Sequence, residues 1–322
     1  MNLLADLLVT AAFAFAFSMG AHYTGACMGM SYASGAIRPL PALLLMAPLT
    51  LAGAALASGG VESTVGHGLL LAATVPVALA LATLASAFLL TTAFNLAKVP
   101  TSTIQLLVFS VVGAGLAHHL EINWGTIERL LLLWAIAPFA ASALGYLLVR
   151  VADRRLLPHA EAPSELVGMA AFGLVAMGSI ASFAMGANDV SNASGAFIMT
   201  GLFSPLTAGL IGGAGLALGV LTWGQPLLKR VAFEIVQLDP RMATSAQLSQ
   251  AAVILSYVSF GYFTSMNQAL VGAMIGAGFA RPSGKIKWAA VRGIAVGWGV
   301  GPLSGAAVGA GLTFLLAYVH LL

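Results

Sequence analysis

The feature that most constrains this chain is its series of long apolar stretches separated by short connections. They lie at about 3–19, 40–58, 69–94, 102–117, 129–151, 166–187, 205–222, 251–280 and 289–319. A helix needs roughly 20 apolar residues to cross a bilayer, and several stretches reach that length. Only 7% of the 322 residues are charged, against about 25% in a soluble domain. The sequence therefore predicts an all-α polytopic membrane protein that is embedded in the lipid bilayer.

Composition also narrows the class of function. The net charge of +3 is small and scattered, which argues against a nucleic-acid partner. The single cysteine, Cys27, excludes an intramolecular disulfide and a cysteine-based metal cluster. The chain shows no nucleophile–base pair, no phosphate-cradling loop and no metal-ligand cluster. We therefore expect no enzyme activity, no catalytic residue, no resident metal and no cofactor.

The chain contains an internal repeat. A polar connector at 151–165 separates an N-terminal half, 1–150, from a C-terminal half, 166–322. The segment "VPTSTIQ" (99–105) matches "YFTSMNQ" (262–268), and "FSMGA" near the start matches "FAMGA" in the second half. These signals keep one order at a nearly constant offset of 163 to 166 residues. We interpret the chain as two transmembrane repeats joined by a cytoplasmic connector.

Loop charge indicates how the repeats are oriented. Basic residues mark cytoplasmic loops, and 281–287 holds three of them whereas its counterpart, 118–123, holds none. Arg38 likewise has no basic counterpart in 201–205. Equivalent loops thus lie on opposite sides, which predicts an inverted repeat of the kind found in secondary transporters. The same map places both termini outside a plasma membrane. It leaves open whether the Thr-Ser segments are re-entrant tips or turns between full spans.

The two Thr-Ser segments are the first candidate site. Helix ends at membrane depth offer backbone N–H groups and dipoles that favour anions, and hydroxyl side chains add uncharged donors. We expect an anion site of Thr101, Ser102, Thr103, Gln105, Thr264, Ser265 and Gln268. The alternative is that these hydroxyls bond back to their own helices. Lys98 precedes the first tip and could offset an anion's charge or extend to the membrane interface.

The second candidate site is the polar interruption of the first helix in each half. Asp189, an acid within a span, is a functional candidate by default; with Asn188 and Asn192 it could bind a proton or Na⁺. His22 and Tyr23 occupy the equivalent positions in the first half. Glycines at 20, 29, 186 and 195 are interpreted as opening the helices at these interruptions. Glu62 falls in an exterior loop, where we expect it to be solvated.

These motifs resemble the inorganic phosphate transporter (PiT) family. "GANDVSNASG" (186–195) is close to the family signature Gly-Ala-Asn-Asp-Val-Ala-Asn-Ala-x-Gly, and the Thr-Ser segments resemble its paired tips. The resemblance implies an inverted repeat with broken first helices and re-entrant hairpins, and commonly a homodimer. It also implies that the tip residues bind the anion while Asn188, Asp189 and Asn192 couple transport to an ion.

The first copy of the signature is degraded, which resembles the sulfate permease branch of the family. It carries His22, Tyr23 and Ala26 in place of Asn, Asp and Asn. Sulfate needs no proton acceptor at neutral pH, so one acid fewer favours sulfate over phosphate. The expectation is a secondary transporter that imports sulfate by alternating access, coupled to H⁺ or Na⁺. A phosphate symporter of the same fold and a passive anion channel are the alternatives.

Overall fold

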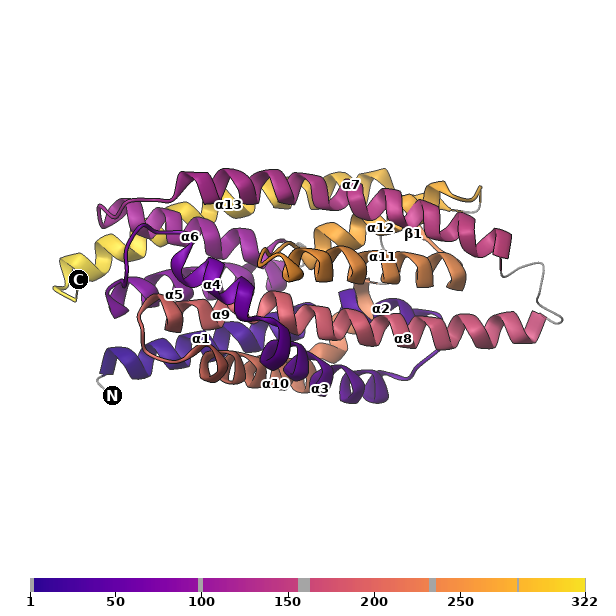
Figure 1. The fold of residues 1–322 in the computed structure, drawn as a ribbon, viewed down its shortest axis with the longest axis horizontal. Coiled ribbons are helices and arrows are strands. Elements are labelled where there is room, and N and C mark those ends of the chain that lie inside the picture. The colour runs from indigo at the N-terminus through magenta and orange to yellow at the C-terminus, as the bar shows by residue number, and fades with distance from the viewer. Residues whose placement is uncertain (1–2, 98–100, 156–162, 232–235, 283, 322) are drawn as a thin grey trace.

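The computed structural model describes residues 3–97, 101–155, 163–231, 236–282 and 284–321, which are predominantly helical (Figure 1). In chain order the elements are α1 (Leu3–His22), α2 (Thr24–Ala33), α3 (Pro39–Ala57), α4 (Gly59–His67), α5 (Val77–Ala97), α6 (Thr103–Ala117), α7 (Trp124–Arg155), α8 (Pro163–Asp189), α9 (Ser191–Met199), α10 (Pro205–Val231), β1 (Val236–Gln237), α11 (Pro240–Ser259), α12 (Met266–Phe279), β2 (Lys285–Ile286) and α13 (Trp288–Tyr318).

Most of these helices run along the long axis of the molecule (Figure 1). Within the described ranges, seven helical stretches are long and apolar enough to cross a membrane. The prediction of an all-α polytopic membrane protein is therefore confirmed, and the two short strands, β1 and β2, form one antiparallel pair. The expected span at 69–94 is shorter than predicted, because α5 begins only at Val77. The expected exterior loop at 59–68 is largely the helix α4, which packs against α9.

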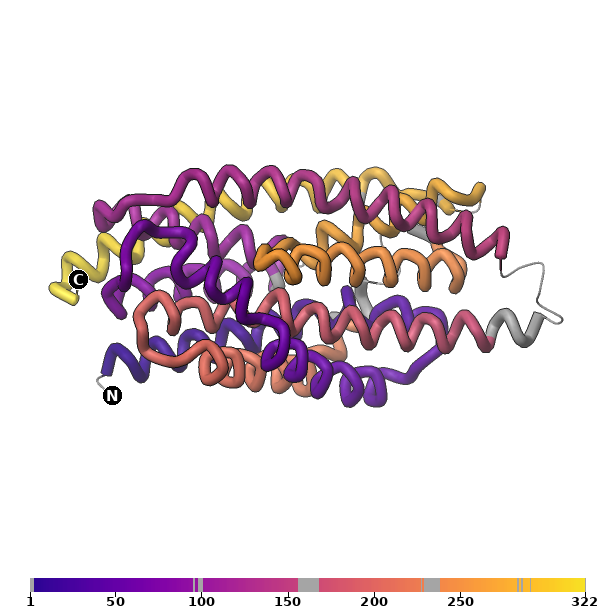
Figure 2. The backbone as a smooth tube through the Cα atoms, viewed as in Figure 1, coloured from indigo at the N-terminus to yellow at the C-terminus, as the bar shows by residue number. Residues whose placement is uncertain are grey.

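Two helices are too short to span. The helix α6 has 15 residues and α12 has 14, which at 1.5 Å per residue gives about 22 Å and 21 Å. The hydrocarbon core is about 30 Å thick. Each packs against the preceding helix, α5 or α11, and the two pairs enter from opposite ends and turn near the middle (Figure 2). This is the geometry of re-entrant hairpins, as expected for the Thr-Ser tips.

The first helix of each half is interrupted once. The helices α1 and α2 meet at Tyr23, and α8 and α9 meet at Val190. In Figure 1, α1 runs away from the end of the molecule that holds both termini, whereas α8 runs back toward that end. These opposite directions are what an inverted repeat requires.

The helices of the two halves pack against each other in reciprocal pairs. A Cβ placed on Gly20 of α1 would lie 2.0 Å from the carbonyl oxygen of Leu216 on α10. A Cβ on Gly186 of α8 would lie 1.9 Å from the carbonyl oxygen of Thr50 on α3. The same close contact thus occurs twice, at positions separated by the 166-residue offset of the repeat. The pairs α6–α13 and α12–α7 also cross between the halves.

The expected role of four glycines is wrong. Gly20, Gly29, Gly186 and Gly195 lie inside α1, α2, α8 and α9, not at the interruptions. Three of them leave no room for a side chain: Gly195, for example, would place a Cβ 2.4 Å from Cγ1 of Val65. Small residues let membrane helices approach closely, and close approach is what these glycines provide.

Candidate functional site

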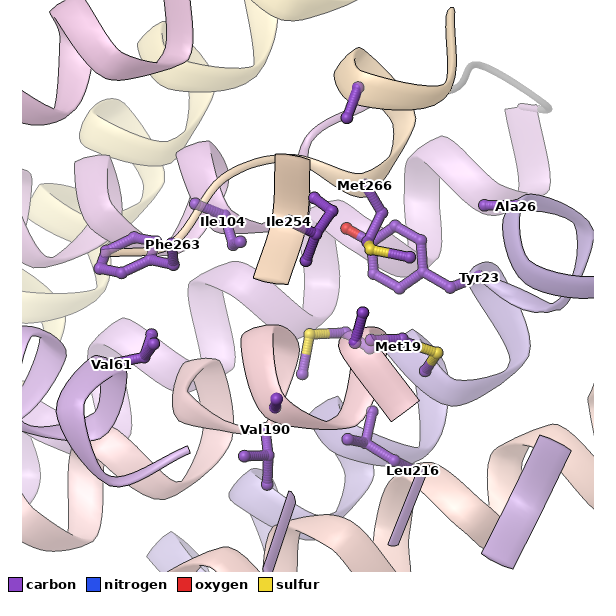
Figure 3. Close-up of a cluster of buried hydrophobic side chains, with 14 of the residues drawn as sticks. Met19, Tyr23, Ala26, Val61, Ile104, Val190, Leu216, Ile254, Phe263 and Met266 are labelled. Atoms are coloured by element: carbon purple, nitrogen blue, oxygen red, sulfur yellow. The ribbon is translucent and has the colours of Figure 1, made fainter. Parts of the chain in front are cut away.

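Four chain segments meet at the centre of the molecule: the interruptions at Tyr23 and Val190, and the first turns of α6 and α12. The expected site residues from both halves are all buried there. They are His22, Tyr23, Thr101, Ser102, Thr103, Gln105, Asn188, Asp189, Asn192, Thr264, Ser265 and Gln268. His22, at 9% relative exposure, is the most accessible of them. Figure 3 shows apolar side chains from the same segments, including Met19, Ile104, Val190 and Met266.

The two serines at the tips act as helix caps. Ser102 precedes α6, and its Oγ accepts a hydrogen bond from the Gln105 backbone N–H at 3.3 Å. Ser265 precedes α12 and accepts from the Gln268 backbone N–H at the same distance. Such caps begin a helix by satisfying one of its unpaired N–H groups. The Ser102 and Ser265 hydroxyls thus hydrogen-bond to their own helices, which is the alternative to an anion-binding role that the sequence left open.

Asn188 holds the second tip at two points. Its Nδ2 donates to the backbone carbonyl of Thr264 at 2.9 Å, and its Oδ1 accepts from the Thr264 N–H at 3.0 Å. The same Nδ2 donates to Asp189 Oδ2 at 3.1 Å. One amide side chain therefore connects the interruption of α8–α9, its own acid and the tip before α12.

Tyr23 makes the corresponding connection to the first tip. Its hydroxyl and Thr103 Oγ1 are 2.7 Å apart in a buried hydrogen bond. The phenol is also close enough to Asp189 to interact with its carboxylate. The ring of His22 packs edge-on against that of Tyr23, with centroids 4.9 Å apart. The two residues that replace the first signature's Asn and Asp thus reach the tips and the remaining acid.

Asn267 is a central residue that sequence reasoning missed. Its Nδ2 donates to the backbone carbonyl of Thr101 at 3.1 Å and lies 3.1 Å from Nε2 of His22. It therefore joins the tip of the second half to the tip and the interrupted helix of the first. The repeat concealed it, since the equivalent position holds Ile104. The available signal was a second amide beside Gln268 in the segment "TSMNQ" (264–268).

Two glutamines of α11 were also missed. Gln247 donates to the carbonyl of Ala26 at 3.0 Å and to Gln250 Oε1 at 2.7 Å. Gln250 donates to the carbonyl of Met266 at 3.2 Å. They connect α11 to α2 and to the first turn of α12.

Lys98, which was expected to lie near the first tip, falls outside the described residues.

Several buried oxygen atoms at this centre have no hydrogen-bond partner among the described residues. They include the hydroxyls of Thr101 and Thr264, which occupy equivalent positions in the two tips. Oδ1 of Asp189 and Oδ1 of Asn192 are also unpaired. Buried polar groups are nearly always hydrogen-bonded. The centre therefore offers two hydroxyl donors and two acceptor oxygens to a small polar ligand.

Glu62 is not solvated, contrary to the expectation for an exterior loop. The residue is only 1% exposed, and Oε1 accepts a hydrogen bond from the Ser194 hydroxyl at 2.6 Å. Ser194 lies on α9, directly beyond the interruption that carries Asp189. The helix α4 brings Glu62 into this position, and the local sequence, polar and glycine-rich, did not predict it.

The comparisons with known proteins identify the chain's relatives. Residues 19–168 and 153–309 match the phosphate transporter family. A probable low-affinity inorganic phosphate transporter of Mycobacterium bovis is 30% identical over 93% of this chain and 74% of its own length. The sulfate permease CysP of Bacillus subtilis is 27% identical over 83% of this chain and 75% of its own length.

A solved structure has the same fold. It is described as the sodium-dependent phosphate transporter, and it superposes with a TM-score of 0.89 over 99% of this chain and 100% of its own. The two sequences are 22% identical. The named relatives are transporters and permeases, so the chain is not an enzyme. The family match covers most of the chain, and this protein belongs to the phosphate transporter family.

Proposed function

We propose that this protein is a secondary transporter of a small tetrahedral oxyanion, with inorganic phosphate as the first substrate. One observation carries the proposal: the unpaired hydroxyls of Thr101 and Thr264 are buried at equivalent positions of the two tips. Each precedes the N-terminus of a helix, α6 or α12, whose dipole favours an anion. Thr103, Gln105 and Gln268 stand in the adjoining first turns and complete the proposed anion site.

The acceptor atoms at the centre support phosphate over the sulfate expected from the sequence. Phosphate still carries a proton at neutral pH and needs an acceptor for it, and Asp189 Oδ1 and Asn192 Oδ1 are unpaired. The relatives at 30% identity are also named as phosphate transporters. Sulfate stays the second candidate, because the sulfate permease CysP is a relative as well.

Asp189 is the proposed coupling residue. A buried carboxylate in a membrane protein is costly unless a cation or a proton neutralises it. One of its oxygens accepts from Asn188, and the other is unpaired. We propose that H⁺ or Na⁺ binds there, with Asn188, Asn192, His22 and Tyr23 positioning the group. Occupation of Asp189 would act on the second tip through the two bonds between Asn188 and Thr264.

Alternating access fits this geometry better than a continuous pore. The bonds Tyr23–Thr103 and Asn188–Thr264 tie the tips to the interrupted helices, and the bond Asn267–Thr101 ties the two tips to each other. The two hairpins are therefore held together at the centre by specific hydrogen bonds. We further propose that the protein is a homodimer in a plasma membrane. In each subunit the halves 1–150 and 166–322 would rock against each other, and the connector 151–165 would lie in the cytoplasm. Both termini lie at one end of the molecule, as the predicted exterior location of both requires (Figure 2).

Uptake into proteoliposomes tests the proposal. Radiolabelled phosphate and sulfate are offered separately and in competition, under independently clamped Na⁺ and H⁺ gradients. We expect concentrative phosphate uptake that one of the two gradients drives. Uptake of sulfate with no competition from phosphate would overturn the substrate, and flux independent of either gradient would indicate a channel.

The variant Asp189→Asn separates coupling from binding. It should retain exchange of labelled for unlabelled anion but lose uptake against a gradient. Uphill uptake by this variant at the rate of the unaltered chain would remove Asp189 from the coupling role.

A further inference from the structure

A cavity of about 580 Å³ is lined mainly by α7, α12 and α13, and it shares Gln105 and Gln268 with the central site. Its inner wall includes Gln105, Gln268 and Trp298, and most of its other lining residues are apolar. Near its mouth, Phe139 is 76% exposed and Trp288 is 51% exposed. The helices α7 and α13 are the least buried of the candidate spans. The cavity therefore opens on the side of the molecule that faces the bilayer.

Gln105 and Gln268 each end a Ser-x-x-Gln pattern at one of the two tips. Ser-x-x-Gln is a capping box, in which the serine accepts from the glutamine's N–H and the glutamine oxygen accepts from the serine's N–H. Both serines make their half of this exchange. Neither glutamine makes the other half, since Oε1 of Gln105 and Oε1 of Gln268 have no partner among the described residues. The residues are 6% and 4% exposed, and both line the cavity.

A third polar atom completes this wall. Nε1 of Trp298 is buried and unpaired, and the indole lines the same cavity. The wall therefore provides acceptors in the two amide oxygens and donors in the amide and indole nitrogens. The lining residues include no charged side chain. A ligand that satisfies this wall needs an uncharged group that both donates and accepts hydrogen bonds, attached to an apolar body.

We propose that the cavity is a binding site for an uncharged single-chain amphiphile, with its hydroxyl head on Gln105 and Gln268 and its alkyl chain directed to the mouth. The volume lies within the range of about 300–1,000 Å³ for small-molecule pockets. Such a ligand enters from the bilayer, and its head would contact Gln105 and Gln268, which also belong to the proposed anion site. The proposal does not depend on which anion is transported.

Photolabelling of the purified, reconstituted protein tests this site. The probe is dodecanol carrying a diazirine, and the labelled peptides are located by mass spectrometry. We expect saturable labelling of α7, α12 or α13, competed by unlabelled dodecanol. An alkane probe without the hydroxyl should label about 30-fold less, because two hydrogen bonds at about 1 kcal/mol each are lost.

A pair of variants on α7 supplies the control. Ala135 lines the cavity and is exposed, so Ala135→Phe fills the mouth without entering the core. Ala143 is exposed on the same helix but does not line the cavity. We expect Ala135→Phe to abolish labelling and Ala143→Phe to leave it intact, with both variants eluting from a sizing column like the unaltered protein.

Three results would overturn the proposal. Equal labelling of both variants would place the probe elsewhere, and equal labelling by the alkane would remove the polar wall from recognition. Absence of saturable labelling, together with efficient disulfide cross-linking of two Ala135→Cys subunits, would assign the cavity to a second copy of the chain.

Discussion

Replacement of Asn188 by alanine removes a contact that joins two distant parts of the chain. The variant loses both hydrogen bonds to the backbone of Thr264, of 2.9 Å and 3.0 Å, in a site where both residues are fully buried. It leaves a backbone N–H and a C=O without their partner. Each buried group left in this way costs about 1–3 kcal/mol. The tip before α12 should therefore open more readily, whatever happens to the rest of the fold.

Hydrogen–deuterium exchange at the tip measures this effect directly. Since each of the two groups costs about 1–3 kcal/mol, the local opening free energy falls by at least that amount, and exchange of the Thr264 amide speeds up by at least about 5- to 150-fold. Asn192→Ala is the matched control, because within the described residues that buried asparagine donates only to the sulfur of Met19, at 3.4 Å. We expect the control to change exchange at Thr264 by less than about threefold, and Asn188→Ala also to lose anion uptake.

The reasoning fails if the Thr264 segment exchanges at the same rate in both variants. It fails equally if Asn188→Ala accelerates exchange throughout the molecule, since the contact would then support the whole fold. Only a change confined to the tip and the neighbouring turn of α12 supports the specific role of the amide.

Three further predictions follow from contacts within the described residues. Glu62 lies outside the candidate spans, and its burial raises the pKa of its carboxyl above the ordinary value of 4.5. The hydrogen bonds from Ser194 and Ser58 lower that pKa and offset part of the rise. The folded chain then holds the Glu62 proton more tightly than the unfolded chain, so the free energy of unfolding falls as pH rises from about 4.5 through the raised pKa. In Glu62→Gln the melting temperature should change less with pH across that range. A Cβ on Gly276 would lie 1.8 Å from a carbonyl oxygen of α7, so Gly276→Ala should destabilise by about 1–3 kcal/mol. Gly311→Ala should not destabilise the protein, because a Cβ there would meet nothing within 4 Å. Equal melting temperatures of the Gly276→Ala and Gly311→Ala variants would contradict the close contact at Gly276. A double-mutant cycle of Tyr23→Phe and Thr103→Val should show a coupling of about 0.5–3 kcal/mol in unfolding; additive losses would exclude the bond.

The sequence predicted the elements whose signals are local. Hydropathy and length identify the spans, because a helix in lipid must satisfy its own backbone over about 20 residues. The repeat was readable because related residues keep a constant offset, and the same offset reappears in the reciprocal contacts of Gly20 and Gly186. The tips were recognised from short polar motifs, and the structure brings both to the centre.

Other features depended on packing between distant segments. Asn267 contacts residues 166 and 245 positions earlier, and no local pattern marks such a partner. Glu62 was assigned to an exterior loop because its neighbours are polar and small, whereas α4 places it against Ser194. Gly20, Gly186 and Gly195 were expected to open the helices, but each lies in a close helix contact, which depends on a neighbour that the local sequence does not identify.

The sequence by itself therefore determined the membrane class, the duplication and the residue types available to an anion and a cation. The tertiary structure decided which of those residues have unsatisfied atoms. Ser102 and Ser265 are occupied as helix caps, whereas Thr101 and Thr264 retain unpaired hydroxyls. The physical reason is that hydrogen-bond satisfaction is a property of a buried environment. Within this fold the environment comes from helices of both halves, separated by well over a hundred residues in the chain.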